Sequence, residues 1–277
     1  MTLKATKSKP GPPAIKIRRT ELRNREPLDP HDTPELDTRL IWALLFFCVA
    51  AFAKFPQIDL VIASHYFQPG VGFVYRQNPV VLALYHWTPW IGRTLILLLA
   101  LFWGFNGFVA AWFRKRGQAV VADKCQGPWR QLAVLAVVSA LLGPGLLIEG
   151  FFKNVAGRPR PVQVVELGGN VPYRGPFEWG GDPGSHKSFV SSHAAAGFAL
   201  MSLGLTCGPV WRRRWLLIGT VTGGAVGVGR MLQGGHFFSD ILFAFYAVWV
   251  CNELVLMWSK RQPPSPARNR ASGSTRT

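Results

Sequence analysis

Three residues close to one another in the sequence could act together in catalysis. The stretch GRMLQGGHFFSD, residues 229–240, contains Arg230, His236 and Asp240. His236 and Asp240 are four residues apart, so on a helix they would share a face. An aspartate that accepts the imidazole Nδ1 hydrogen leaves Nε2 free as a nucleophile. The spacing therefore predicts a nucleophile, His236, that is oriented by Asp240.

Two further polar clusters stand at the ends of apolar stretches, and with Arg230 they predict an anion site. One is KNVAGRPRP, with Lys153 and Arg160, and the other is SFVSSHAAAG, with Ser191, Ser192 and His193. Cations at one surface repel one another unless an anion lies among them, and arginine forks match phosphate oxygens. Serine hydroxyls and amides at a helix N-terminus would add donors. We expect a phosphate to be bound by Lys153, Arg160, Arg230, Ser191 and Ser192. Arg158 could belong to this site or only to the membrane interface.

This set of residues is typical of phosphoryl transfer through a covalent intermediate. His236 would attack phosphorus. His193 would protonate the leaving oxygen and later activate water. General acid–base catalysis of this kind raises the rate about 10²–10⁴-fold. The cations would stabilise charge on the equatorial oxygens. The sequence has no cluster of carboxylates suited to magnesium, so the predicted scheme uses no metal ion and no other cofactor.

The composition indicates an integral membrane protein that must position these clusters. Of 277 residues, 49% are hydrophobic, and they gather in blocks of about 20, the length that crosses a hydrocarbon core. We predict an all-α, six-helix membrane bundle with spans at 39–55, 90–113, 131–152, 189–208, 214–231 and 237–258. The aromatic-rich residues 56–89 predict interfacial segments. Glycines 219, 223 and 227 predict close helix packing.

The basic residues predict the orientation of this bundle. Lys and Arg number nine in residues 1–39, five in 114–130, three in 212–214 and five after 259, which is 22 of 31. The positive-inside rule then places both termini in the cytoplasm and the polar active-site loops outside. It also explains the net charge of +17 better than nucleic-acid binding does. The membrane domain is predicted to comprise residues 39–258. Residues 1–38 before it and 259–277 after it are predicted to be disordered basic tails, both in the cytoplasm.

The three clusters resemble the motifs of the type 2 phosphatidic acid phosphatases. That family has Lys, six residues, Arg-Pro; then Pro-Ser-Gly-His; then Ser-Arg, five residues, His, three residues, Asp. The first pattern is matched by Lys153 and Arg160-Pro161, and the third by Arg230, His236 and Asp240. The middle motif reads Val190-Ser191-Ser192-His193, and the third begins with Gly229. The resemblance covers roughly residues 90–258.

The resemblance implies a metal-independent phosphatase of membrane lipid phosphates, with the residue roles given above. The stretch from GRPRP to SFVSSHA is similar to lipid A phosphatases of Gram-negative bacteria, which implies a bacterial inner membrane and a periplasmic site. Phosphatidylglycerophosphate, undecaprenyl pyrophosphate and phosphatidic acid stay open as substrates. The loop 161–188 is expected to cover the site.

Two alternatives lie outside this class. A non-catalytic lipid-binding or transport protein would need the phosphate site but not His236, Asp240 and His193. Vanadate-dependent haloperoxidases use a similar anion pocket, but they are soluble, and six spans argue against them. The sequence indicates no oligomeric state.

Overall fold

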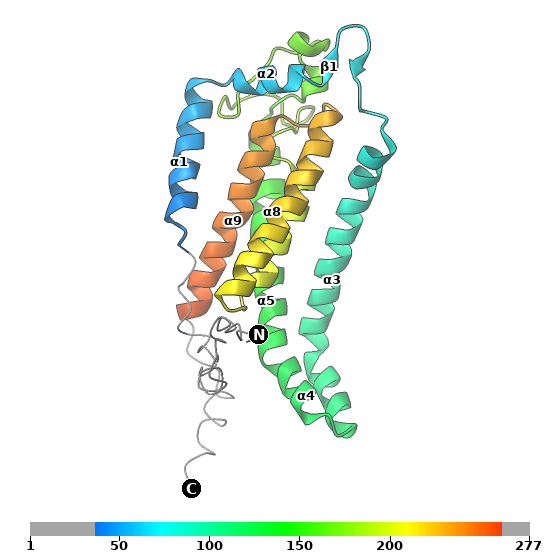
Figure 1. Cartoon of the computed structure of the whole chain (residues 1–277), viewed down its shortest axis with the longest axis vertical. Helices are drawn as coiled ribbons and strands as arrows, with labels where there is room; N and C mark the ends of the chain where they lie inside the picture. The colour runs from blue at the N-terminus through cyan, green and yellow to red at the C-terminus, as the bar shows by residue number, and fades with distance from the viewer. Residues whose placement is uncertain (1–36, 262–277) are drawn as a thin grey trace, which may run out of the picture.

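The computed structural model describes residues 37–261, which fold mainly into helices that run along one long axis (Figure 1). The N-terminal part consists of α1 (Arg39–Lys54), α2 (Ile58–Ser64), a hairpin of β1 (Phe67–Gln68) and β2 (Gly72–Phe73), α3 (Pro79–Lys115) and α4 (Ala119–Gln126). The rest consists of α5 (Pro128–Ala140), the π-helix η1 (Leu141–Phe152), α6 (Lys153–Val155), the 3₁₀ turns η2 (Pro161–Gln163) and η3 (Val165–Leu167), α7 (Ser192–Phe198), the 3₁₀-helix η4 (Ala199–Gly204), α8 (Pro209–Leu232) and α9 (Phe238–Arg261). The predicted tails, 1–38 and 259–277, lie almost wholly outside the described residues.

The helices of the described part are those of a multi-pass membrane protein. Four are long and apolar enough to cross a bilayer: Pro79–Lys115, Ala119–Val155, Pro209–Leu232 and Phe238–Arg261. A fifth span is possible if α1 and α2, which meet at a bend of 86°, count as one. Large apolar side chains such as Phe46, Leu97, Phe108 and Leu217 are exposed, as the lipid-facing surface of a membrane helix requires.

The second predicted span begins earlier than expected, at Pro79 instead of residue 90. The side chain of Asn78 caps this helix by accepting a hydrogen bond from Val80 N at 3.0 Å. Pro79 occupies the first turn, where a missing N–H costs little. The helix then continues through Pro89, which directly precedes the predicted start of this span. The aromatic-rich segment 56–89 is therefore partly helix α3.

The fourth predicted span, 189–208, is shorter in the structure, and none of its residues before Gly208 is exposed. It forms α7 and η4, which together cover residues 192–204, less than the roughly 20 residues of a full span. The glycines of α8 allow this segment to pack closely, because a Cβ at Gly219 would collide with Met201 and one at Gly223 with Phe198. The predicted packing role of these glycines is confirmed.

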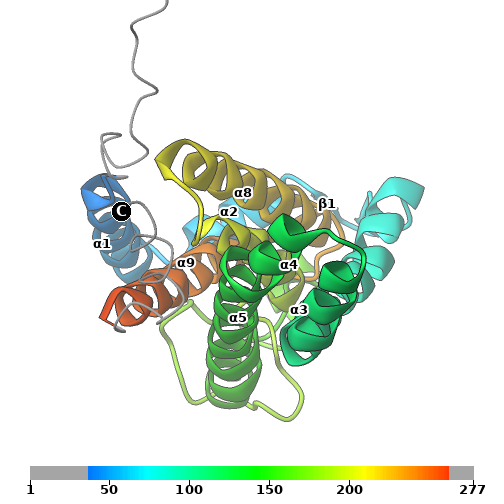
Figure 2. The same ribbon diagram turned by 90° about the horizontal axis from the view of Figure 1, so that it is seen from below.

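The polar loops gather at one end of the helices. Figure 1 shows α2, the hairpin and the loop that follows α6 at this end, whereas α4 lies at the opposite end. Seen along the long axis, α1 lies beside α9 on one side, and α3 lies on the other side of the molecule (Figure 2). Contacts of α7 with η1, α8 and α9 bring the ends of these helices together.

Candidate active site

The three predicted clusters meet where α8 joins α9. The backbone amide of Ser191, just before α7, donates to the carbonyl of Asp240 at 3.0 Å. The ammonium group of Lys153 donates to the carbonyls of Lys187 at 2.6 Å and Ser188 at 3.3 Å. Segments that are up to 87 positions apart, from Lys153 to Asp240, therefore share one region of the fold.

Asp240 is fully buried and holds the turn that carries His236. Its Oδ2 accepts hydrogen bonds from Ser188 Oγ at 2.6 Å and from the Phe237 amide at 2.9 Å. The second of these bonds resembles a capping box, in which the third helical residue reaches back to the N-cap amide. His236 Nδ1 lies 3.4 Å from the same oxygen. His236 thus precedes α9, so the two side chains meet across a helix start and not along one helical face.

Burial sets the charge of His236. It lowers the pKa of the imidazole to about 3, and the neighbouring Asp240 opposes that shift only in part. His236 is therefore neutral near pH 7. A carboxylate beside Nδ1 favours the tautomer with hydrogen on that nitrogen, which leaves the Nε2 lone pair available for attack.

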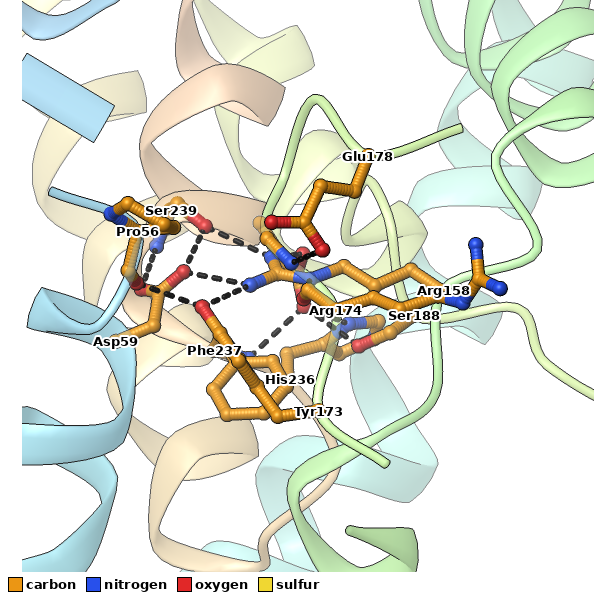
Figure 3. A network of polar contacts seen from close by, with 12 residues as sticks. Pro56, Asp59, Arg158, Tyr173, Arg174, Glu178, Ser188, His236, Phe237 and Ser239 are labelled. Atoms are coloured by element: carbon orange, nitrogen blue, oxygen red, sulfur yellow. Dashed lines mark hydrogen bonds and ion pairs between the residues drawn. The ribbon is translucent and has the colours of Figure 1, made fainter. Parts of the chain in front are cut away.

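Arg158 lies at the centre of a buried polar network beside this pair (Figure 3). Its side chain is 1% exposed, and each of its five N–H groups has an acceptor. These bonds reach Arg174 O at 2.9 Å, Ser239 Oγ at 2.8 Å, Asp240 Oδ1 at 2.6 Å, Asp59 Oδ2 at 2.7 Å and Tyr173 Oη at 3.1 Å. Burial alone would lower the pKa of Arg158, but Asp240 and Asp59 raise it above its usual value. Arg158 is thus permanently charged and has no donor left for a ligand.

The other cations have free donors and no carboxylate partner of this kind. Lys153 and Arg230 are each 7% exposed, and Arg160 is exposed. Electrostatic interactions couple all three to His193. Within residues 37–261, no ion pair joins Lys153, Arg160 or Arg230 to an acidic side chain. Also within this range, no three His, Cys, Asp or Glu side chains are placed to share a metal ion. The arrangement can accept an oxyanion.

Arg230 is held by groups that do not neutralise it. Its guanidinium lies 4.5 Å from the ring centre of Tyr85 and donates to the side chain of Gln233. Its Nε is buried with no hydrogen-bond partner. A Cβ at Gly235 would collide with the same guanidinium, so the glycine turn after α8 makes room for it. Gly234 adopts a φ of 66°, which favours glycine.

The serine and histidine at the start of α7 have different surroundings. Ser191 is buried and caps α7, because its Oγ accepts a hydrogen bond from Ala194 N at 3.4 Å. Ser192 and His193 are half-buried. The imidazole of His193 stacks on Tyr85, with ring centres 4.9 Å apart and planes inclined by 17°. Tyr85 thus lies against both His193 and Arg230.

Sequence reasoning missed three residues of this region, Asp59, Tyr85 and Ser188. Asp59 is 0% exposed, and its carboxylate accepts hydrogen bonds from Arg158 and from the amide of Ser239 at 2.9 Å. An acidic residue in the apolar stretch IDLVIAS is itself a signal, because buried charges in membrane segments are costly and mark functional sites. Tyr85 and Ser188 carry no comparable signal in the sequence.

Comparisons with known proteins point to one family. Residues 131–263 match the family model described as PAP2 superfamily. The chain is also 29% identical, over 229 residues, to a protein named lipid A 4'-phosphatase from Francisella tularensis subsp. novicida (strain U112). That match covers 78% of this chain and 94% of the relative. No solved structure gives a significant match.

Proposed function

We propose that this protein, whose residues 131–263 match the PAP2 superfamily model, is a lipid phosphatase that works without a metal ion, through a phosphohistidine intermediate. The observation that carries the proposal is a neutral His236 beside Asp240, next to three cations that have no carboxylate partner among the described residues. A protein that merely binds phospholipid would need those cations but not the oriented histidine.

The reaction has two steps that conserve atoms and protons. His236 Nε2 attacks phosphorus, the bond from phosphorus to the lipid oxygen breaks, and His193 gives that oxygen its proton. Neutral His193 then takes a proton from water, the water oxygen attacks the phosphohistidine, and His236 leaves. One water is consumed, and inorganic phosphate and a lipid alcohol are released. The negative charge of the bound phosphate offsets the repulsion between His193 and the cations, so substrate and proton bind together.

The phosphate is bound by the groups whose donors are free. Lys153, Arg160 and Arg230 neutralise its charge, and Arg230 offers a planar fork that matches two oxygens. Ser191 and Ser192 stand at the N-terminus of α7, where their hydroxyl groups can donate to an anion, whereas the Ser191 amide is already bonded to the Asp240 carbonyl. These donors do not need to reorganise during the reaction, which is the source of electrostatic stabilisation in such sites.

Lipid A bearing a phosphate monoester is the proposed substrate, on the strength of the relative's name and the length of its match. Purified protein should release inorganic phosphate from lipid A in the presence of EDTA. Parallel reactions should contain phosphatidylglycerophosphate, undecaprenyl pyrophosphate and phosphatidic acid. A clear preference for one of these would replace lipid A as the substrate. Binding of all four lipids without release of phosphate would contradict the enzyme proposal.

We infer that the protein has six spans in a bacterial inner membrane, with its site on the periplasmic side. The polar loops lie at the end of the helices opposite α4 and the basic turn around it. Such basic turns face the cytoplasm by the positive-inside rule. Segment 189–208 counts as the fourth span in this topology, although its helical part is short.

Labelling of introduced cysteines should separate the two ends. In a variant without the four native cysteines, Asn170→Cys should react with a membrane-impermeant thiol reagent in intact spheroplasts, whereas Gln118→Cys should react only after lysis. Both positions are exposed, so a difference in labelling between them reports the side of the membrane on which each lies. Position 169 is unsuitable because a Cβ there would collide with Gln163. The reverse labelling pattern would place the site in the cytoplasm.

The Tyr85 ring should matter more than its hydroxyl group. Loss of its stacking on His193 and its contact with Arg230 should cost about 1–3 kcal/mol, so Tyr85→Leu should lower kcat/KM about 10- to 100-fold. Tyr85→Phe keeps the ring and should stay within about twofold of wild type. Trp87→Leu, a change of an exposed aromatic residue on the same helix, is the control. Equal activity of Tyr85→Leu and wild type would remove Tyr85 from the site.

A further inference from the structure

We propose that Asp59 on α2 is a positioning residue for catalysis, acting through Arg158 on Asp240 and so on His236; this inference rests on the proposed phosphatase function. Asp59 lies outside residues 131–263, the part that matches the family. The N-terminal segment would thus be a working part of the active site and not only a membrane anchor.

Asp59 is joined to the catalytic pair by a continuous chain of buried hydrogen bonds. Arg158 Nη2 donates to Asp59 Oδ2 at 2.7 Å, and Nη1 of the same guanidinium donates to Asp240 Oδ1 at 2.6 Å. Ser239 forms a second link, because its amide donates to Asp59 Oδ1 at 2.9 Å and its hydroxyl also donates to Asp59. Ser239 directly precedes Asp240. Both routes therefore end at the residue that faces His236.

The geometry explains why an arginine lies between the two carboxylates. Asp59 and Asp240 are both 0% exposed, and two buried carboxylates so close together would repel each other without a cation. A guanidinium presents its donors in one rigid plane. It can therefore fix the orientation of each carboxylate relative to the other. A lysine could neutralise the charge, but it could not fix both orientations.

The network also fixes α2 over the site. Tyr173 accepts from Arg158 at 3.1 Å and donates to Pro56 O at 2.6 Å, at the bend between α1 and α2. The ring of Phe237, next to His236, lies 4.5 Å from the Arg158 guanidinium. With every donor of Arg158 occupied, a shift of Asp59 would leave a buried N–H unpaired, which is costly. The position of α2 and the orientation of Asp240 are thus linked.

Asp59→Asn tests the proposal, because asparagine keeps the size of the side chain and removes its charge. We expect kcat to fall about 10- to 100-fold, the loss that follows when the hydrogen-bond partners that orient metal ligands are changed, because Asp59 orients Asp240 in a similarly indirect way. The Kd for vanadate, which reports the phosphate site, should stay within about twofold of wild type. Glu253→Gln is the matched control. It removes the acidic partner of Arg212 from an ion pair whose N–O distance is 2.6 Å and which lies away from the site. The control should keep wild-type kcat.

A double-mutant cycle separates positioning from general stability. If Asp59 acts through Asp240, then Asp59→Asn should lower kcat by less than about twofold in an Asp240→Asn background. A merely structural role would lower kcat by the same factor in both backgrounds. Ser239→Ala, which removes one hydroxyl and no charge, should repeat the pattern with a smaller loss if Asp59→Asn proves too unstable to purify.

The outcomes are distinct. Wild-type kcat in Asp59→Asn, or an undiminished loss in the Asp240→Asn background, would overturn the inference and leave the phosphatase proposal intact. Absence of phosphate release by the wild-type protein from every lipid phosphate would instead refute the proposed function, on which this inference depends.

Discussion

His236→Gln should abolish turnover, with kcat lower by about 10⁴-fold or more, as the loss of a nucleophile or its activating partner produces in covalent catalysis. Glutamine keeps a polar side chain of similar length but offers no imidazole lone pair. The protein should still fold and insert, because the substitution breaks no close side-chain hydrogen bond. The Nδ1 atom of His236 lies 3.4 Å from Asp240 Oδ2. Asp240→Asn should fall short of this loss, since the nucleophile remains and only its orientation suffers.

Trapping of the phosphoenzyme provides the direct measurement. Wild type should carry label from a radiolabelled lipid phosphate when it is quenched in alkali, because acid hydrolyses the nitrogen–phosphorus bond. His236→Gln should carry none. His65→Gln, a change of an exposed histidine outside the site, should behave as wild type. Label retained in His236→Gln would identify another nucleophile and end the covalent role of His236.

Arg230→Lys should lower kcat/KM by about 10²–10³, the loss expected when one preorganised donor to the transition state is removed. Lysine keeps the positive charge but has no planar fork. It also cannot maintain the same contact with the Tyr85 ring. A large loss with charge conserved would therefore assign the effect to geometry.

Ligand-induced stabilisation gives a second measurement that does not depend on turnover. Vanadate at about 100 times its Kd should stabilise wild type by about 2.7 kcal/mol, and this gain should shrink in Arg230→Ala. Arg213→Lys, at the exposed opposite end of the same helix, is the control for both experiments. Equal vanadate binding by Arg230→Ala and wild type would mean that Arg230 only anchors α8 at the membrane surface.

The spacing of the polar clusters predicted much of the candidate site. Lys153, Ser191, His193 and Asp240 come together as expected because each lies where a helix begins or ends, and the helix ends lie on the same side. The spacing could not show that His236 precedes α9. It also could not assign Arg158, whose role depends on a carboxylate nearly 100 positions away.

The helical fold followed from hydropathy, whereas the helix limits did not. An asparagine cap and tertiary contacts allow α3 to start at Pro79 and to pass through Pro89, against the local preference of proline. The helical segment after Ser191 is shorter than the predicted span 189–208 because both ends of that stretch, outside residues 192–204, are not helical. Asp59 and Tyr85 were missed because they reach the site only through the packing of α2 and α3.

The saturated guanidinium of Arg158 also bears on the design of inhibitors. An anionic compound cannot recruit this arginine without breaking its bonds to Asp59 and Asp240, so the inhibitor must obtain its affinity from Lys153, Arg160 and Arg230 alone. Small tetrahedral oxyanions suit that set.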